Sequence, residues 1–166
     1  MEEIPSPEDW QQWLEENASR LLLFARQQCR VALDAEDVLQ EALVEAWNRT
    51  GNRGLPPLPL VFATIRRRAI DRARSDDRRR NREETISSTD EAWFDTSVVD
   101  AEMREQMESG MKELREIYRE AVTLKIWGGL TFDEIGNVLE ISPNTAASRY
   151  RYGIEALRKN LKSVLA

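Results

Sequence analysis

Histidine is absent from this 166-residue sequence, and cysteine occurs once, as Cys29. These two residue types supply most zinc ligands, and histidine is the usual base of catalytic triads. Zinc sites and histidine-based triads are therefore excluded, although metal sites built from Asp and Glu remain open. A single cysteine cannot form an internal disulfide, which favours a reducing compartment such as the cytoplasm.

Long apolar runs are also missing. No stretch approaches the ~18 apolar residues that a membrane span needs, and the first ten residues, MEEIPSPEDW, lack the basic and apolar segments of a signal peptide. With 41% hydrophobic and 33% charged residues, the composition is that of a globular protein. The length suits one domain or two small ones. We expect a cytoplasmic protein that does not insert into membranes.

Charge is distributed unevenly along the chain, whose formal net charge is −6. Residues 51–82 carry 10 basic and 3 acidic groups, for +7, and residues 141–166 carry 5 and 1, for +4. The other segments are acidic: residues 1–50 sum to −7, residues 83–110 to −8 and residues 111–140 to −2. Two basic blocks within an acidic background predict separate surfaces for anionic partners.

Apolar residues recur at helical spacing nearly throughout, and no segment alternates like a strand. The exception is residues 75–100, which are rich in Ser, Thr, Asp and Glu and contain one apolar pair, Trp93-Phe94. We interpret this segment as an acidic linker. The sequence thus predicts an all-α fold of two small helical domains, residues 1–74 and 101–166, joined by a flexible linker.

The N-terminal domain is expected to contain a series of helices. The first begins with the cap Ser6 and a proline, and its apolar stripe includes Cys29, which we expect to be a buried and unreactive thiol. The second begins at Asp34 in DAEDVLQEALVEAWNR. After the loop TGNRGLPPLP, a third runs from about Leu60 to Ala73. The polar side of the second helix consists of Asp37, Gln40, Glu41 and Glu45.

The third helix has an apolar side and an arginine side. On a helical wheel Arg66 falls on the apolar side, and Asp71 lies one turn from Arg67, where it can order the arginines. A face needed only for solubility would mix charge signs, whereas arginine forms bidentate contacts with phosphates. We therefore favour a nucleic-acid surface over a solvated face. This arginine face consists of Arg67, Arg68, Arg72 and Arg74, and is continued by Arg78, Arg79, Arg80 and Arg82.

The segment GLTFDEIGNVLEISPNTAASRYRYGIEALRKNL predicts a helix-turn-helix. Thr131 and Glu134 form a capping box that opens a short helix, and Ser142-Pro143 begins a longer one after a tight turn. Glu140 stands in that turn where glycine is more usual. In such motifs the start of the second helix enters the DNA major groove; the alternative is a purely structural helical hairpin. The residues placed to contact DNA are Asn144, Thr145, Ala147, Ser148, Arg149 and Arg151.

Together these motifs resemble the bacterial RNA polymerase sigma factors of the small, two-domain extracytoplasmic-function (ECF) type. DAEDVLQEALVEAW and LVFATIRRRAIDRAR are similar to consecutive helices of sigma region two. LREIYREAVTLKIW and the helix-turn-helix are similar to region four, with Arg115 where the family has a proline between two helices. The resemblance covers most of residues 10–74 and 100–162.

The resemblance implies a role for each surface. Asp37, Gln40 and Glu41 would dock on the clamp helices of core RNA polymerase. The arginine face would meet the minus-ten promoter element, residues 50–59 would capture a flipped base, and the helix-turn-helix would bind the minus-thirty-five element. The acidic linker would either lie in a basic channel of the polymerase or be solvated and disordered. An anti-sigma protein is a further partner that the resemblance suggests; no catalytic residue, cofactor or small-molecule substrate is implied.

Two other functions remain open. A stand-alone DNA-binding regulator would need only residues 111–162, and Glu41 would then have no role. A nucleic-acid enzyme with Asp and Glu metal ligands is the third alternative, although no convergent carboxylate cluster is visible in the sequence.

Overall fold

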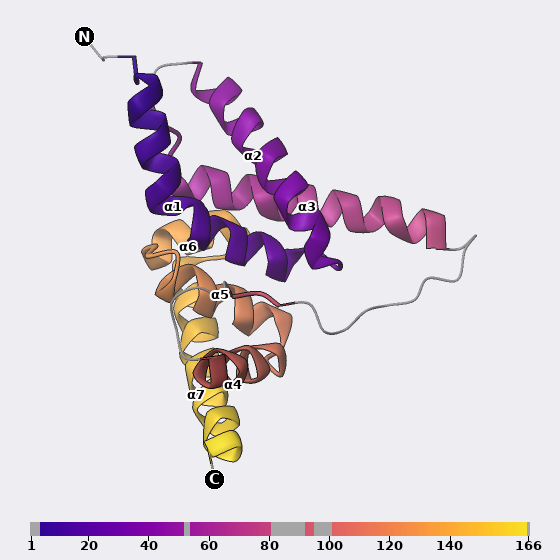
Figure 1. Cartoon of the computed structure of the whole chain (residues 1–166). Helices are drawn as coiled ribbons and strands as arrows, with labels where there is room; N and C mark the ends of the chain where they lie inside the picture. Colours follow the sequence, from indigo (N-terminus) through magenta and orange to yellow (C-terminus); the bar gives the residue numbers. More distant parts are fainter. Residues whose placement is uncertain (1–3, 52–53, 81–91, 95–100, 166) are drawn as a thin grey trace. The chain divides into compact units, whose positions relative to one another are not determined.

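The computed structural model describes residues 4–51, 54–80, 92–94 and 101–165, and all regular secondary structure within these ranges is helical. The chain divides into two compact units, Met1–Glu91 and Ala92–Ala166 (Figure 1). The expectation of an all-α fold is confirmed.

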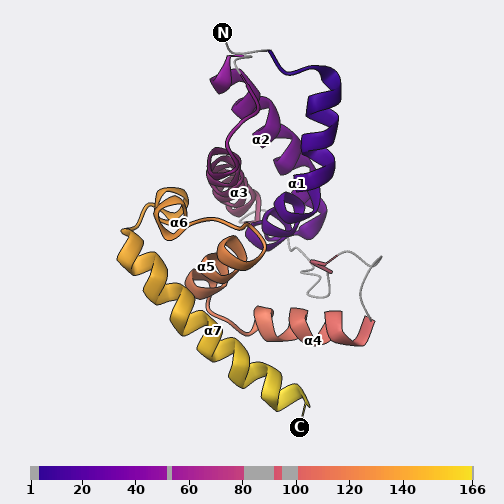
Figure 2. The ribbon, with the colours of Figure 1, turned by 90° about the vertical axis from the view of Figure 1, so that its left-hand side faces the viewer.

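The described part of the N-terminal unit contains the α-helices α1 (Pro7–Gln28), α2 (Ala35–Thr50) and α3 (Leu58–Arg80). A short 3-10 helix, η1 (Ala32–Asp34), connects α1 to α2. Each of the three α-helices packs against the other two (Figure 2). The predicted cap of α1 is present, because the amide of Asp9 donates to Ser6 Oγ at 3.2 Å and the amide of Ser6 donates to Asp9 Oδ2 at 2.9 Å.

The core of this unit forms where the apolar sides of the three helices meet. Phe24 of α1 lies edge-to-face with Phe62 of α3, with ring centroids 5.4 Å apart, and both rings are buried. Leu21, Val38 and Ile65 are fully buried and come from α1, α2 and α3 respectively. Because Phe62 and Ile65 face this core, the side of α3 that carries the arginines faces away from it.

The helix α3 is longer than the sequence pattern predicts. We expect a helix from about residue 60 to residue 73, whereas the structure extends it to Arg80 and so includes residues 75–80, which we assign to the linker. Neither glycine nor proline occurs in this stretch, so nothing in the local sequence ends the helix. Arg82 and most of the predicted linker, residues 81–91 and 95–100, lie outside the described residues, as do positions 52 and 53 of the loop.

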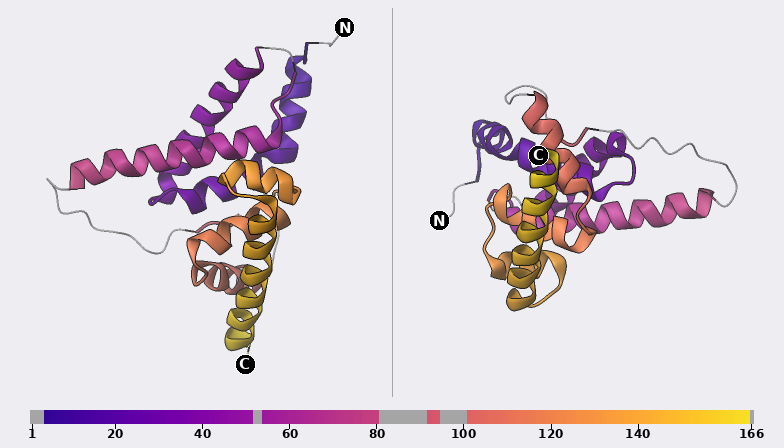
Figure 3. Two further views of the ribbon diagram at one scale, coloured as in Figure 1. Left: turned by 180° about the vertical axis from the view of Figure 1, so that it is seen from behind. Right: turned by 90° about the horizontal axis from the view of Figure 1, so that it is seen from below.

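The C-terminal unit is formed by α4 (Ala101–Lys112), α5 (Glu116–Ile126), α6 (Phe132–Leu139) and α7 (Pro143–Leu165). The long helix α7 packs against α4, α5 and α6, and two further views show its course (Figure 3). Met111, Val122 and Leu157 lie at the centre of this packing, each from a different helix. The unit therefore has its own apolar core.

A break separates α4 from α5, although apolar residues continue at helical spacing through it. Arg119 of α5 reaches back to the last turn of α4 and the connection after it, where its guanidinium donates to the carbonyl oxygens of Met111 at 3.2 Å and Leu114 at 2.9 Å. Carbonyl groups at a helix end have no partner within the helix. The carbonyl oxygen of Met111 also accepts from the amide of Leu114 at 3.1 Å, and Arg119 adds a second donor there and a donor at Leu114, so it stabilises the break.

The start of the predicted helix-turn-helix is present at α6. The amide of Glu134 donates to Thr131 Oγ1 at 3.1 Å, and the amide of Thr131 donates to Glu134 Oε1 at 2.9 Å, which completes the capping box. The buried side of α6 is strongly apolar, with Ile135, Val138 and Leu139 facing the core. This short helix therefore has a fixed start and a fixed orientation.

The turn between α6 and α7 depends on two backbone positions. Glu140 has φ 59° and ψ 45°, in the left-handed region that favours glycine. A Cβ atom at Gly136 would lie 2.7 Å from the carbonyl oxygen of Ile141, so the turn closes only because residue 136 has no side chain. At the start of α7 the amide of Thr145 donates to Ser142 Oγ at 3.1 Å, the expected cap.

Candidate functional site

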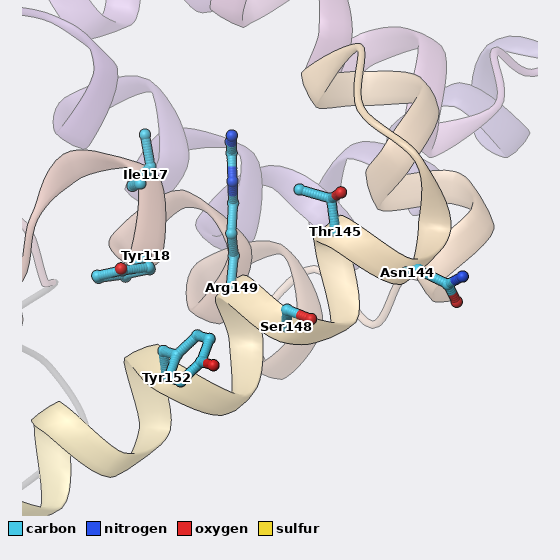
Figure 4. Close-up of a pocket in the computed structure, with 7 residues that line it drawn as sticks. All are labelled: Ile117, Tyr118, Asn144, Thr145, Ser148, Arg149 and Tyr152. Carbon is cyan, nitrogen blue, oxygen red and sulfur yellow. The ribbon is translucent and has the colours of Figure 1, made fainter.

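The first turns of α7 present most of the predicted DNA-contacting side chains on one side of the helix (Figure 4). They face a shallow groove of about 300 Å³ between α5 and α7. Arg151 is exposed and Ala147 half-buried, and neither lines the groove. Four of the six predicted residues do line it: Asn144, Thr145, Ser148 and Arg149.

The lining also includes Ile117, Tyr118 and Tyr152, which the sequence motifs do not predict as contact residues. Tyr152 is 56% exposed and lies one turn beyond Ser148 on the same side of α7 (Figure 4). Its ring centroid is 6.3 Å from that of Tyr118 on α5. Helical spacing could have identified Tyr152, whereas the position of Tyr118 depends on how α5 packs against α7.

The groove is lined by side chains of the kinds that bind duplex DNA. Its amide, hydroxyl and guanidinium groups can bond to base edges and phosphates, and its rings can contact a thymine methyl group. Close packing holds α7 in place, since a Cβ atom at Gly153 would lie 2.6 Å from Val122 Cγ2 and 3.1 Å from the carbonyl oxygen of Tyr118. The recognition side chains are therefore mounted on a helix that is fixed against α5.

The arginine face of α3 lies against the polar side of α2. Arg67 forms an ion pair with Glu45, and Arg68 is 3.1 Å from Glu45 and 3.2 Å from Glu41. Further along α3, Arg72 is 3.8 Å from the carboxylate of Asp37 and also donates to the carbonyl oxygen of Asp34 at 3.3 Å. Charged side chains of both helices line one groove of about 490 Å³, among them Glu41, Glu45, Arg67, Arg68 and Arg72.

Arginines of this face therefore have partners within the unit, which the sequence pattern does not indicate. Arg67, Arg68 and Arg72 are already paired within the unit, because packing α2 beside α3 brings opposite charges together. They keep some access to solvent, with 44%, 33% and 32% of their side chains exposed. Arg74 is exposed and forms no ion pair with any residue that the structure describes.

The pairing changes the acid–base behaviour of Glu45. Burial alone would raise the pKa of this carboxyl group, but the charges of Arg67 and Arg68, together with the hydrogen bond from Arg67, outweigh that effect. The pKa of Glu45 therefore lies below its ordinary value, and the carboxylate is ionised at neutral pH.

The predicted polymerase-contacting residues remain accessible on the outer side of α2. Gln40 is exposed, and 67% of the Asp37 side chain and 48% of the Glu41 side chain are exposed. Asp37 and Glu41 thus form ion pairs with α3 without being buried. A partner can reach all three side chains.

The rest of the described chain carries no further candidate metal site or membrane span. No three Asp, Glu or Cys side chains are grouped there so that they could hold a metal ion. None of its helices combines the length and apolar character that crossing a bilayer requires. Burial, reinforced by Asp34 and opposed by Arg72, raises the pKa of Cys29 to about 11, so this thiol stays protonated at neutral pH.

Comparison with known proteins decides the family. Residues 13–79 match Sigma-70 region 2, and residues 104–157 match Sigma-70, region 4. RNA polymerase sigma factor CarQ of Myxococcus xanthus is 31% identical over 87% of this chain and 84% of its own length. The chain belongs to the sigma-70 family of RNA polymerase sigma factors. The arginine face and the polar side of α2 both fall within region 2 of this sigma factor, and the α7 groove falls within region 4.

Other similar proteins define the branch of the family. ECF RNA polymerase sigma factor SigL of Mycobacterium tuberculosis is 27% identical over 90% of this chain and 87% of its own length. ECF RNA polymerase sigma factor SigK of Mycobacterium sp. (strain KMS) is 28% identical over 76% of this chain and 69% of its own length. The sigma factor RpoE of Bartonella quintana, solved in complex with the anti-sigma factor NepR, has the same fold, with a TM-score of 0.74 and 21% identity over 93% of this chain and 98% of that one. This protein is a sigma factor of the ECF type that acts in transcription initiation.

Proposed function

We propose that this sigma factor binds core RNA polymerase through α2 and recognises promoter DNA through α3 and α7. The observation that carries the proposal is the α7 groove, whose polar lining lies within the residues that match region 4. A second observation also supports the proposal, namely the charged groove between α2 and α3 within region 2. A sigma factor needs surfaces for both DNA and polymerase. The candidate DNA surfaces are on α3 and α7, and the candidate polymerase surface is on α2.

The α7 groove is the proposed reader of the minus-thirty-five element. Arg149 and Ser148 would reach base edges in the major groove, and Arg151 would contact the phosphate backbone. Tyr152 would extend the same reading surface by one turn, because it is exposed beside Ser148. The complete proposed set is Asn144, Thr145, Ala147, Ser148, Arg149, Arg151 and Tyr152.

The arginine face is the proposed contact for the minus-ten element. Arg67, Arg68 and Arg72 would have to exchange their carboxylate partners on α2 for DNA phosphates, whereas Arg74 is exposed from the start. Partly exposed ion pairs contribute only about 0–1 kcal/mol. The exchange is therefore inexpensive, and bidentate arginine–phosphate contacts can replace the lost pairs.

The exposed side of α2 is the proposed polymerase contact, through Asp37, Gln40 and Glu41. The protein would supply recognition while the polymerase supplies the chemistry, so we propose that it is not itself an enzyme and acts in the cytoplasm. The structural neighbour from Bartonella quintana was solved with an anti-sigma factor. By analogy we extend the proposal to an anti-sigma partner for this chain.

The experiment that tests the proposal is capture by bacterial core RNA polymerase, followed by run-off transcription from a promoter library. Gln40→Lys and Glu41→Lys should abolish capture, since both add positive charge to the proposed polymerase face. Gln40→Lys is the cleaner variant because it does not remove the ion pair between Glu41 and Arg68. Glu16→Lys, at an exposed position of α1, is the matched control and should bind normally.

The same experiment separates the proposal from the stand-alone regulator. A regulator that uses only the C-terminal unit would bind its DNA without polymerase, and substitutions at Gln40 and Glu41 would leave that binding unchanged. Normal capture of folded Gln40→Lys and Glu41→Lys would contradict the polymerase role of α2.

A further inference from the structure

The aromatic pair Trp93-Phe94 is docked on the C-terminal unit, although the sequence places it within the acidic linker. The backbone amides of Trp93 and Phe94 both donate to Oε1 of Glu108 on α4, at 3.0 and 2.8 Å. Hydrogen bonds from amides to an ionised carboxylate are stronger than those between neutral groups. Only 14% of the Glu108 side chain is exposed, so this acceptor lies at the base of a formed site.

Both rings have partners in the same unit. The Trp93 ring lies 5.0 Å from Lys112 Nζ and 5.1 Å from the Arg119 guanidinium. The Phe94 ring centroid is 5.4 Å from that of Trp127 at the end of α5. Trp93 also packs against the apolar core cluster of the unit. Cation–π contacts, aromatic packing and charge-assisted hydrogen bonds thus converge on two adjacent residues.

The docking site is built from α4 and α5 independently of the segment that fills it. Arg119 is held by the carbonyl oxygens at the end of α4, and Lys112 lies 4.0 Å from Glu108, one helical turn away. These contacts hold the cations and the carboxylate through residues of α4, α5 and their connection, without the aromatic segment. We call Trp93 and Phe94, together with this site, the aromatic clip.

The clip shortens the chain that separates the two units. Between the end of α3 at Arg80 and the docked Trp93, residues 81–92 remain, which is 92 − 80 = 12 residues. A chain of that length spans at most about 40 Å. With the clip open, the tether would run to the start of α4 and include residues 81–100, or 100 − 80 = 20 residues, which span at most about 70 Å.

We propose that the aromatic clip sets the distance over which the sigma factor can bridge its two promoter elements. This inference rests on the proposed function, in which α3 and α7 contact separate elements of one promoter. A linker too short for its two sites prevents simultaneous binding. The difference of about 30 Å corresponds to roughly nine base pairs of B-DNA at 3.4 Å each. A closed clip therefore restricts initiation to short spacings, and an open clip admits longer ones.

The test is run-off transcription by core RNA polymerase with the full-length chain, on a template library in which both elements and the spacing between them vary. The double variant Trp93→Ala, Phe94→Ala should increase initiation at spacings longer than the wild-type optimum, on the order of tenfold relative to that optimum. An insertion of about eight Gly and Ser residues after Glu84 should have the same effect with the clip intact, because it adds directly the chain length that opening the clip releases. Glu108→Gln keeps an oxygen acceptor but loses the charge, and should give a smaller change.

Amide hydrogen exchange provides a readout that does not depend on transcription. The amides of residues 93 and 94 should be protected in the wild type and in the insertion variant, and should exchange rapidly in the double variant. Rapid exchange at residues 93 and 94 in the double variant would show that the clip is open. If the double variant and the insertion variant then both keep the wild-type spacing preference, the inference is overturned while the proposed function stands. If the wild type fails to initiate at every spacing, the proposed function is overturned, and this inference with it.

Discussion

The guanidinium of Arg68 on α3 lies 3.2 Å from the carboxylate of Glu41 on α2, so the two residues form an ion pair. In the proposed function, Arg68 contacts the minus-ten element and Glu41 contacts the polymerase. In that case the ion pair holds both side chains until DNA binds Arg68 or polymerase binds Glu41. Capture of Glu41 by polymerase would leave Arg68 without one of its carboxylates, and would favour its transfer to a phosphate.

Removing the carboxylate of Glu45 should increase the affinity of the isolated chain for duplex DNA, because Glu45 pairs with both Arg67 and Arg68. We expect Glu45→Gln to raise the affinity about two- to fivefold, the equivalent of about 0.5–1 kcal/mol for partly exposed pairs. Fluorescence anisotropy at two salt concentrations measures this. Glu16→Gln removes the same charge from an exposed site on α1. Equal gains in both variants would show that only net charge matters.

Stability should depend on pH through Glu45. Its pKa in the folded chain lies below the ordinary value of 4.5, so the unfolded chain takes up a proton at higher pH than the folded chain does. The contribution of Glu45 to the free energy of unfolding is therefore present above about pH 4.5, and is lost as the pH falls through the folded pKa. Urea unfolding of wild type and Glu45→Gln between pH 3 and 7 tests this. A stability difference that stays constant over that range would exclude it.

Arg149 should read sequence in the α7 groove. We expect Arg149→Ala to weaken binding of the holoenzyme to its promoter by about 1–3 kcal/mol, and to relax preference at one base position. If Arg149 contacts only phosphate, the loss will be similar on all sequences, and the dependence of binding on salt will decrease by about one ion. Competition binding with promoter variants distinguishes these outcomes. Lys159→Ala, at an exposed position further along α7, is the control for general loss of positive charge.

Glu140 should be a strained position. Its φ of 59° lies in the left-handed region, which costs most residues about 1–2 kcal/mol. Glycine removes that cost but adds freedom to the unfolded chain, so we expect Glu140→Gly to raise the free energy of unfolding by about 0.5–1 kcal/mol. Glu155→Gly makes the same change inside α7, and should destabilise by about 1 kcal/mol. Chemical denaturation of both variants provides the comparison, and equal losses would show that the turn is unstrained.

Cys29 should be a slow nucleophile in the folded chain. Burial raises its pKa from 9.0 to about 11, so at pH 8 the thiolate should be about a hundredfold less abundant than in the unfolded chain. The stability contribution of the neutral thiol is full below about pH 9, and is lost as the pH rises through about 11. Alkylation by iodoacetamide at pH 8, with and without urea, measures the ratio. Equal rates would mean that the thiol is not protected by the fold.

Local features of the protein could be predicted from its sequence because neighbouring residues determine them. The cap at Ser6 and the capping box at Thr131 join side chains and amides three residues apart, and the tight turn at Glu140 follows from the short separation of α6 and α7 in the sequence. The apolar stripes indicated which sides of the helices are buried. These interactions form within one or two helical turns, so a linear pattern contains them.

Only the tertiary structure decided which charged and aromatic residues meet. Arg68 and Glu41 are 27 positions apart, and nothing in either helix alone indicates that they pair. The same holds for Trp93 with Glu108, and for Tyr118 beside Tyr152. A run of arginines looks identical in sequence whether it faces solvent, DNA or its own carboxylates, because charge attracts through space and not along the chain. The sequence by itself determined the helices and the polarity of their faces, and the packing of those helices selected the partners.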